Sequence, residues 1–596
     1  MQDYRRSAQS LLPKRSAATS PGEYNMYPAY ALEDGKIEHG FDDLARHLSG
    51  HSQIAIDGYV GVLWDHFRTQ LDTSLRKQGV NAHWVSVDSA LHAPAEIDRL
   101  VEPYLGGNDP LFGKRFAGEL IDFFNRDALA RLAAQAGADT IIFFGTGAAL
   151  ITQEAYRVYV DVPKNEIQYR SRAGSIRNLG AAQPHEPGVM YKRFYFVDWV
   201  VLNPHKATLL PKIDLFIDEQ DPGNPALITG DALRATLTEI SHSYYRVRPW
   251  FEPGPWGGQW MKEHIAGLVK EGIPNYAWSF EMIAPEQGLI LDSGGHLLEL
   301  SCDLLMYHDP YAILGQHAER FGYEFPIRFD FLDTIAGGNL SVQCHPRPSF
   351  IREHFGETFT QDETYYILDC QPAAKVYIGF REDSDPQHFR LMLEHSLDEG
   401  TPVDIDRYVM AIPSEKHKLF LIPNGTIHGS GADNLVLEIS ATPYIFTFKM
   451  YDWLRLDLSG KPRPLNIERA FDNLYFHYRG DLVERELIAQ PYVLERGEDW
   501  QVIHLPTHVS HFYDVHRLEF STSVKVDTGD SPHILMLVEG SSVILETRSG
   551  KRQRFNYAET FIIPAAADEY QLINESDVTA RVVKAFLKPG WIEPEE

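Results

Sequence analysis

The sequence has few cysteines and a shortage of positive charge, and both features limit the kind of protein it can be. Three cysteines in 596 residues are too few for a disulfide framework, so we expect a reducing, cytoplasmic compartment. No apolar run is long enough to cross a membrane, and the N-terminal segment lacks the hydrophobic core of a signal peptide. Lysine and arginine total 55 against 83 acidic residues, and a net charge of −28 opposes nucleic acids and anionic membranes as partners.

The rest of the composition is that of a large globular protein with several domains. Hydrophobic residues make up 44% of the chain, which allows large cores, and the length corresponds to about four units of typical size. Strand and helix patterns alternate in the first part, whereas short apolar strands separated by turns dominate the second. We predict a flexible lead over residues 1–40, an α/β domain over 41–240, and two all-β domains over 241–475 and 476–596. The first β domain is expected to hold a helical insert that includes a short helix within residues 397–413.

Four potential metal ligands lie in three strand-like segments of the second part. Gln343 and His345 are two residues apart in LSVQCHP, so on a strand their side chains leave by the same face. Glu363 lies in DETYYIL and His428 in IPNGTIHGSG. Two imidazoles, a carboxylate and an amide oxygen suit Zn²⁺ or a similar divalent ion. The alternatives are a turn residue before a proline for His345, a solvated loop for Glu363 and an exposed imidazole for His428.

These segments, in this order, resemble the class I mannose-6-phosphate isomerases, a family of metal-dependent cupin enzymes. The resemblance covers about residues 246–596 and also includes PGPWGGQWM, FPIRFDFLDT and IFTFKMYDWLRLDLSGKPRPLNIERAFDNL. It implies two cupin jelly rolls, the second without metal, and one divalent ion, expected to be zinc, bound by Gln343, His345, Glu363 and His428. It also implies interconversion of mannose 6-phosphate and fructose 6-phosphate, or of a related sugar phosphate, through an enediol.

Three supporting positions depart from the family pattern. Arg328 stands where the family usually has Lys, Gln361 where it often has Lys, and Lys449 where a typical member has Arg. The resemblance implies that Arg328 and Lys449 assist catalysis at the substrate, whereas residue patterns alone also allow a structural ion pair of Arg328 with Asp330 and an outer-face position for Lys449. Because Gln361 carries no charge, the alternative function is a non-catalytic cupin that binds or senses a sugar.

The first part resembles the P-loop nucleoside and uridine kinases in three segments. The matching segments are IAIDGYVG at the phosphate loop, WVSVDS at the next strand and YVDVPKNEIQYRSRAGSIRNLGA at the Arg-rich lid. The loop pattern is G-x-x-x-x-G-K-[ST], and counting from Gly58 its last three positions hold Leu63, Trp64 and Asp65. The bulky indole of Trp64 would obstruct a bound triphosphate, and the carboxylate of Asp65 would repel it. We therefore expect a degenerate kinase fold that no longer transfers phosphate, with a scaffold or regulatory role.

Three cations remain in the lid-like segment, Arg170, Arg172 and Arg177. They could bind a phosphorylated ligand, or they could form the solvated face of a helix. A fusion in which the first domain still binds a nucleotide is therefore a further alternative. The leading hypothesis is a cytoplasmic, metal-dependent isomerase whose partner is a small sugar phosphate, with neither nucleic acid nor membrane as a partner.

Overall fold

The computed structural model describes residues 4–17, 20–135, 140–152, 154–441 and 444–596. The chain forms two compact units, each assembled from segments that are distant in the sequence. The first unit comprises Met1–Ala17, Tyr27–Ile240 and Pro285–Pro310, and the second comprises Ala18–Met26, Ser241–Ala284 and Tyr311–Glu596. None of the helices in the described residues combines the length and the hydrophobicity that a bilayer crossing requires.

The first unit is built on a seven-stranded sheet with the order β2-β8-β7-β6-β3-β5-β4. Five adjacent strands, β7, β6, β3, β5 and β4, are parallel. All of them except the edge strand β4 are almost entirely buried, as expected for strands covered on both faces. The strands are β2 (Glu38–His39), β3 (Gln53–Gly58), β4 (Ala82–Ser86), β5 (Thr140–Phe144), β6 (Tyr156–Asp161), β7 (Leu215–Asp218) and β8 (Ala226–Thr229).

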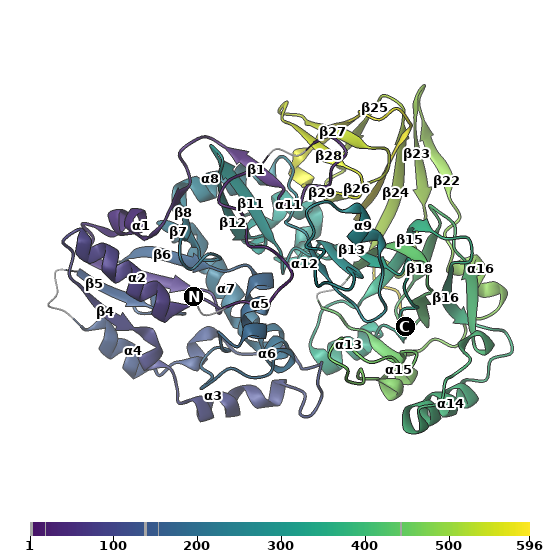
Figure 1. Ribbon diagram of the computed structural model, residues 1–596, viewed down its shortest axis with the longest axis horizontal. Coiled ribbons are helices and arrows are strands. Elements are labelled where there is room, and N and C mark those ends of the chain that lie inside the picture. The colour runs from purple at the N-terminus through teal and green to yellow at the C-terminus, as the bar shows by residue number, and fades with distance from the viewer. Residues whose placement is uncertain (1–3, 18–19, 136–139, 153, 442–443) are drawn as a thin grey trace. The chain divides into compact units, whose positions relative to one another are not determined.

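Helices cover both faces of this sheet (Figure 1). The chain moves from β3 to β4 in one direction and from β4 to β5 in the other, so right-handed crossovers place the connecting helices on opposite sides. The helices are α1 (Phe41–Leu48), α2 (Trp64–Lys77), α3 (Pro94–Val101), α4 (Arg126–Ala133), α5 (Lys164–Ala173), α6 (Pro187–Arg193), α7 (Trp199–Leu209), α8 (Gly230–Ser241) and α10 (Asp303–His308). The first unit is therefore α/β, as the alternating pattern predicted.

A small three-stranded sheet adds two distant segments to the first unit. Strand β1 (Ala29–Leu32) pairs in parallel with β11 (Gly288–Ser293), which pairs with β12 (His296–Ser301). Part of the segment expected to be a flexible lead is thus a strand. Residues 285–310, placed in the first β domain from the sequence, supply the other two strands.

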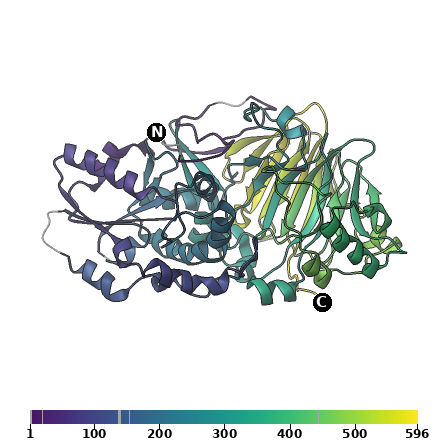
Figure 2. The same ribbon diagram turned by 60° about the horizontal axis from the view of Figure 1, so that its bottom comes forward.

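The second unit begins with two facing antiparallel sheets (Figure 2). A six-stranded sheet has the order β18-β15-β20-β13-β10-β9, and a five-stranded sheet has the order β17-β16-β19-β14-β21. The strands are β9 (Trp250–Glu252), β10 (Trp278–Met282), β13 (Ile327–Asp333), β14 (Val342–Cys344), β15 (Asp362–Cys370), β16 (Lys375–Phe380), β17 (Val409–Pro413), β18 (Leu419–Ile422), β19 (His428–Ser430), β20 (Asn434–Ala441) and β21 (Phe448–Tyr451). Side chains from both sheets build one apolar core, for example Tyr365 and Ile378.

A second pair of antiparallel sheets follows in the same unit. Their orders are β22-β23-β24-β31-β26-β29 and β25-β30-β27-β28. The strands are β22 (Tyr492–Arg496), β23 (Trp500–Leu505), β24 (Tyr513–Phe520), β25 (Ser523–Asp527), β26 (His533–Glu539), β27 (Ser542–Thr547), β28 (Arg552–Asn556), β29 (Thr560–Ile563), β30 (Glu569–Asn574) and β31 (Ala580–Leu587). The alternating pattern in VEGSSVILE predicted two paired strands with a tight turn; β26 and β27 do follow each other there, but they are not paired and belong to different sheets. The domain border at residues 475 and 476 stays a prediction.

The helical insert of the first β domain lies earlier than the sequence suggested. A short helix was predicted within residues 397–413, but α14 (Pro386–Glu399) ends near the start of that range and β17 occupies its end. Asp385 caps α14 by accepting hydrogen bonds from the backbone N–H groups of Gln387 and His388. The other helices are α9 (Trp260–His264), α11 (Pro310–Leu314), α12 (Ala318–Phe321), α13 (Pro348–Phe355), α15 (Ile467–Asn473) and α16 (Asp481–Glu486).

Candidate metal centre

Two imidazoles and one carboxylate converge between the two sheets of the first sandwich. His345 Nε2 lies 2.8 Å from Glu363 Oε2, and His428 Nε2 lies 3.0 Å from the same oxygen. All three side chains are buried, and their candidate ligand atoms lie within 4.8 Å of one another. Glu363 belongs to β15 and His428 to β19, so each sheet contributes to the cluster. The solvated-loop alternative for Glu363 and the exposed-imidazole alternative for His428 are therefore wrong.

The hydrogen bonds of the two imidazoles fit a metal centre. His345 Nδ1 lies 2.9 Å from the backbone carbonyl oxygen of Phe446, and His428 Nδ1 lies 2.9 Å from that of Thr426. A carbonyl oxygen only accepts, so each Nδ1 carries the hydrogen and the Nε2 lone pair of a neutral ring faces Glu363. Two lone pairs and a carboxylate oxygen repel one another unless a cation lies among them. Such backbone partners commonly orient metal-bound histidines.

Burial and the contacts between the three side chains act against each other on the pKa values of this cluster. Burial favours the neutral form of Glu363, but the close contacts of its carboxyl with His345 and His428 outweigh burial and hold the pKa of this carboxyl well below its usual range. Burial also lowers the pKa of His345, although its contact with Glu363 opposes the shift. An ionised carboxylate beside neutral imidazoles is the protonation state in which these groups bind a divalent ion.

Gln343 and Lys449 lie beside the cluster on the five-stranded sheet. Gln343 on β14 is paired with His428 on one side and with Lys449 on the other, and paired residues present their side chains on the same face. The amide Nε2 of Gln343 lies 3.3 Å from His428 Nε2, and a rotation of the amide would bring Oε1 to this position. Burial lowers the pKa of Lys449 to about 8, with Arg463 and Arg455 adding to the shift and Asp452 opposing it. The outer-face alternative for Lys449 is therefore wrong.

Arg328 reaches the cluster through a second carboxylate that the sequence had not singled out. Arg328, Ser440 and Glu363 are successive partners across β13, β20 and β15, so their side chains share a face. Arg328 Nη2 lies 3.1 Å from Glu438 Oε1, and its Nε lies 3.3 Å from Asp330 Oδ2. The ion pair with Asp330, one alternative from the sequence, is present. Burial raises the pKa of Glu438 well above its ordinary value, and the charge of Glu363 adds to the shift.

These contacts explain the positions of two further residues, Glu438 and Gln361. Glu438 is a lone carboxylate inside the apolar run NLVLEIS, and this interruption could have marked it as a candidate. Gln361 is buried, and its Oε1 accepts a hydrogen bond from the backbone N–H of Phe446. Gln361 therefore supports the segment whose carbonyl oxygen orients His345.

The loop before His428 packs tightly against its surroundings. Gly425 has a φ of 70°, and its N–H donates to the carbonyl oxygen of His345 at 2.9 Å. Its own carbonyl oxygen accepts from the N–H of Tyr475 at 2.8 Å. This glycine therefore links the segments that carry the two histidines of the cluster.

In the first unit, the loop that resembles a phosphate loop already contains a carboxylate. Asp57, at the end of β3, accepts hydrogen bonds from the backbone N–H groups of Gly58, Gly147 and Ala149 at 2.7–2.9 Å. Its Oδ2 also lies 2.8 Å from His205 Nε2. Gly58 belongs to this loop, whereas Gly147 and Ala149 follow β5, so the Asp57 carboxylate accepts N–H groups from the ends of two neighbouring strands.

The three arginines of the lid-like segment lie in different environments and do not form one cationic cluster. Arg170 is fully buried, and its Nη1 lies 2.5 Å from Glu219, so neither a solvated face nor a free cation describes it. Arg177 is exposed and lies 3.6 Å from Asp88, and Arg172 lies over the ring of Tyr169. The expectation of a shared solvated face is wrong because burial and ion pairing separate these side chains.

In fold and site, the second unit consists of two successive β-sandwiches, the first of which contains a buried His–Glu–His cluster of metal-ligand type. Over 330 residues the chain is 23% identical to a probable mannose-6-phosphate isomerase of Bacillus subtilis (strain 168), an alignment that covers 55% of this chain and 95% of that protein. It is 28% identical over 285 residues to the mannose-6-phosphate isomerase of Streptococcus mutans, covering 48% of this chain and 80% of that protein. The predicted class of enzyme, an isomerase, is confirmed by these relatives.

Two other comparisons concern the fold and the first unit. The solved structure of the Bacillus subtilis mannose 6-phosphate isomerase aligns with 58% of this chain and 99% of its own, at 19% identity and a TM-score of 0.46. Residues 40–242 match a family described only as a domain of unknown function (DUF8485). The resemblance of the first unit to P-loop kinases therefore stays a prediction.

Proposed function

We propose that this protein is a metal-dependent aldose–ketose isomerase that interconverts mannose 6-phosphate and fructose 6-phosphate. One observation carries the proposal: the Nε2 lone pairs of His345 and His428 face the Glu363 carboxylate, while both Nδ1 hydrogens are donated to backbone carbonyl groups. This arrangement fits a divalent cation. The names of the curated relatives supply the substrate pair.

His345, Glu363 and His428, with the amide oxygen of Gln343, are the residues that would hold the ion. Nitrogen and oxygen donors in this combination favour zinc over magnesium or calcium. A bound divalent ion would polarise the oxygen atoms at C1 and C2 of the sugar and stabilise negative charge on the enediolate. The chain itself must supply the proton transfer and the recognition of the phosphate.

Glu438 is our candidate for the group that moves the proton. Isomerisation takes a proton from C2 of the aldose, forms the enediol and returns a proton to C1, so one base that faces the sugar can serve both steps. Glu438 lies two residues from Ser440 on β20 and presents its carboxylate on the same face as Glu363. Arg328 is bonded to Glu438 and Ser440, and we assign it a positioning role.

Lys449 is our candidate for the cation that meets the substrate. It shares a face with Gln343 and His428, and no ion pair involves it among the described residues. An ammonium group in this position can neutralise a phosphate or the developing enediolate. Gln361, with its amide oxygen engaged by the backbone, contributes no charge.

For the first unit we propose a non-catalytic, kinase-like scaffold. The occupied N–H groups around Asp57 and the indole of Trp64 at the start of α2 support this proposal. We further propose a cytoplasmic location and a sugar phosphate as the only small-molecule partner of the metal centre.

The test combines metal analysis with a coupled assay of mannose 6-phosphate conversion. We expect one equivalent of divalent metal and measurable turnover in the wild type, and the loss of both in a His345→Ala, His428→Ala double variant. His395→Ala, at an exposed histidine of α14, is the matched control and should change neither.

Other results would point to other functions. Stoichiometric metal without turnover of any hexose phosphate would favour the alternative function, a cupin that binds or senses a sugar. Absence of metal from protein purified without chelators and then incubated with Zn²⁺ would refute the ligand assignment.

A further inference from the structure

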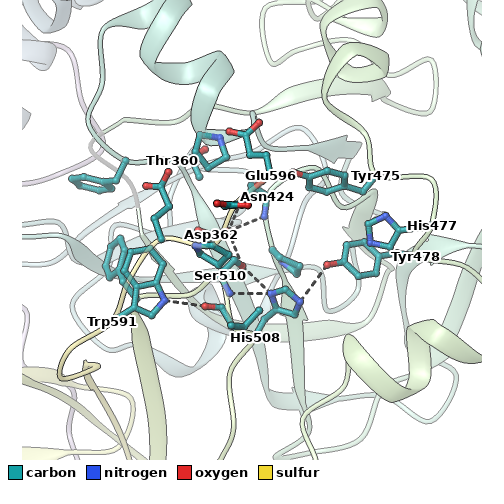
Figure 3. Close-up of a pocket in the computed structure, with 18 of the residues that line it drawn as sticks. Thr360, Asp362, Asn424, Tyr475, His477, Tyr478, His508, Ser510, Trp591 and Glu596 are labelled. Atoms are coloured by element: carbon teal, nitrogen blue, oxygen red, sulfur yellow. Dashed lines mark hydrogen bonds between the residues drawn. The ribbon is translucent and has the colours of Figure 1, made fainter.

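A separate cavity of about 230 Å³ lies in the second unit (Figure 3). Asp362 lines it, and Asp362 directly precedes Glu363 on β15. Successive residues of a strand point to opposite faces of the sheet, so Asp362 faces away from the His–Glu–His cluster. The six-stranded sheet therefore separates this cavity from the candidate metal centre.

The polar centre of the cavity has an unused hydrogen-bond acceptor. Asn424 is 5% exposed, and its backbone N–H and its Nδ2 donate to Asp362 Oδ1 at 2.8 and 3.0 Å. Its Oδ1 is buried and accepts no hydrogen bond within the described part of the chain. A buried acceptor without a donor is unfavourable, so a ligand hydroxyl that donates to Asn424 Oδ1 would gain a hydrogen bond that the chain itself leaves unmade.

Aromatic rings form the walls around this polar centre. Figure 3 shows Trp591 on one side and Tyr475 and Tyr478 on the other, with Asp362 and Asn424 between them. Phe359 and Phe512 also line the cavity and pack edge to face against each other. Sugar rings combine apolar C–H faces with a rim of hydroxyl groups, and aromatic walls around a few hydrogen-bonding groups complement both features.

The charges of the lining exclude a phosphate. Arg320 lies over the ring of Trp591 at 4.3 Å, and its Nη2 lies 3.9 Å from Glu593, which also pairs with Arg352 at 2.7 Å. Glu595 and Glu596 line the cavity as well, so acidic side chains outnumber this one arginine. Burial lowers the pKa of His508 to about 4, which leaves this imidazole neutral near pH 7. The other ionisable groups include the carboxyls of Asp362 and Glu593. A lining without excess positive charge favours an uncharged ligand.

We propose that this cavity binds an uncharged polyhydroxylated ligand of the size of one hexose, at a site distinct from the metal centre. Its volume is below the roughly 300–1,000 Å³ typical of sites for drug-sized ligands, which suits a single ring. Asn424 accepts a ligand hydroxyl, Asp362 offers its second carboxylate oxygen, and Trp591 covers one face of the ring. The site would not take the sugar phosphate of the proposed reaction.

A ligand-observed NMR titration of the intact, metal-loaded protein tests this site. The probes are D-mannose, D-glucose and D-fructose, with tetramethylammonium as a cationic probe. We expect saturable binding of at least one free hexose that an excess of mannose 6-phosphate does not displace and that survives metal removal. Asn424→Ala and Trp591→Ala should each weaken it about tenfold, the effect of losing one good contact. Trp500→Ala, at a tryptophan outside the cavity, should leave it unchanged.

Three outcomes would overturn the proposal. Displacement of the hexose by mannose 6-phosphate, or its loss on chelation, would place the sugar at the metal centre. Binding of tetramethylammonium in preference to all three hexoses would make the cavity a cation site, and no saturable binding of any hexose would remove the site. If Asn424→Ala fails to fold, the affinity of Trp591→Ala for the hexose still tests the site. The result is independent of the isomerase assay, since neither substituted residue is a proposed metal ligand.

Discussion

At the scale of single residues, the proposed proton transfer depends on one carboxyl group. Glu438 is buried, is bonded to Arg328, and lies on the face of the sheet that also carries Glu363. Because two imidazoles engage the carboxylate of Glu363, we take Glu438 as the base. Arg328, which the sequence suggested as catalytic, contacts this base.

Replacing Glu438 by glutamine should separate catalysis from metal binding. We expect Glu438→Gln to keep its metal and to lose turnover by about 10²–10⁴-fold, the usual effect of removing a general base. Steady-state kinetics and metal analysis on the same sample measure both quantities. Glu415→Gln, at an exposed glutamate, serves as the control. Unchanged turnover would show that another group moves the proton.

Lys584 gives a residue-scale prediction for stability in the second sandwich. It is 8% exposed on β31, and burial lowers its pKa from 10.5 to about 8, with Glu495 and Asp514 opposing the shift. Below pH 8 the folded state carries a buried charge. Between pH 8 and 10.5 the unfolded chain binds more protons than the folded one, so this group makes stability rise with pH.

Lys584→Met removes that cost. We expect it to raise the free energy of unfolding by about 1–3 kcal/mol at pH 7, and the gain should shrink above pH 8 and vanish near pH 10.5. Chemical denaturation at several pH values measures the difference from the wild type. Lys525→Met, at an exposed lysine of β25, is the control. A gain that does not depend on pH would mean that packing, and not charge, is responsible.

At the scale of elements, the turn before β19 determines whether His428 reaches Glu363. A Cβ atom at Gly425 would lie 2.6 Å from the carbonyl oxygen of Asn473 and 2.6 Å from the ring of Tyr475, so the turn would have to shift. Gly400, at the end of α14, has nearly the same φ, but a Cβ atom there would meet nothing within 4 Å. A side chain would therefore be strained by the positive φ at both positions, but only at Gly425 would it also collide with neighbouring residues.

Alanine at these two positions should therefore have different effects. We expect Gly400→Ala to cost about 1 kcal/mol of stability from strain alone and to leave metal content unchanged. Gly425→Ala should cost more and should lower the affinity for Zn²⁺ at least tenfold, because His428 moves with the turn. Thermal unfolding and a metal-competition titration measure the two effects. Equal metal affinities would show that the turn relaxes without moving His428.

At the scale of the whole molecule, the chain divides into two compact units, and the proposed metal centre belongs to the second. A metal that binds only the folded second unit stabilises that unit by about 2.7 kcal/mol at a hundredfold excess over its dissociation constant. We expect calorimetry to show that chelation lowers the melting of the second unit and leaves that of the first unchanged. A shift of every transition would mean that the units unfold together.

The same measurement tests nucleotide binding by the first unit. We expect no shift in its melting temperature with Mg²⁺ and ATP, because the N–H groups around Asp57 are occupied and Trp64 follows the loop directly. A saturable increase would support the two-function fusion instead.

Local patterns in the sequence indicated the class of each part of the chain and marked four candidate ligands for the proposed metal centre. Buried parallel strands have continuous apolar runs, and spacing of two along a strand places Gln343 and His345 together, so both features are readable without a fold. The start of α14 was also marked, by Asp385 before a proline, although it was not predicted.

Only the tertiary structure decided the rest, because strand pairing brings together residues that are far apart in the sequence. The pairing of β13, β20 and β15 places Arg328, Glu438 and Glu363 on one face, and no local pattern specifies that register. Arg170 was expected in solvent but forms a buried ion pair with Glu219, which directly follows β7. The assignment of residues 285–310 to the first unit was decided in the same way, by the pairing of β11 with β1.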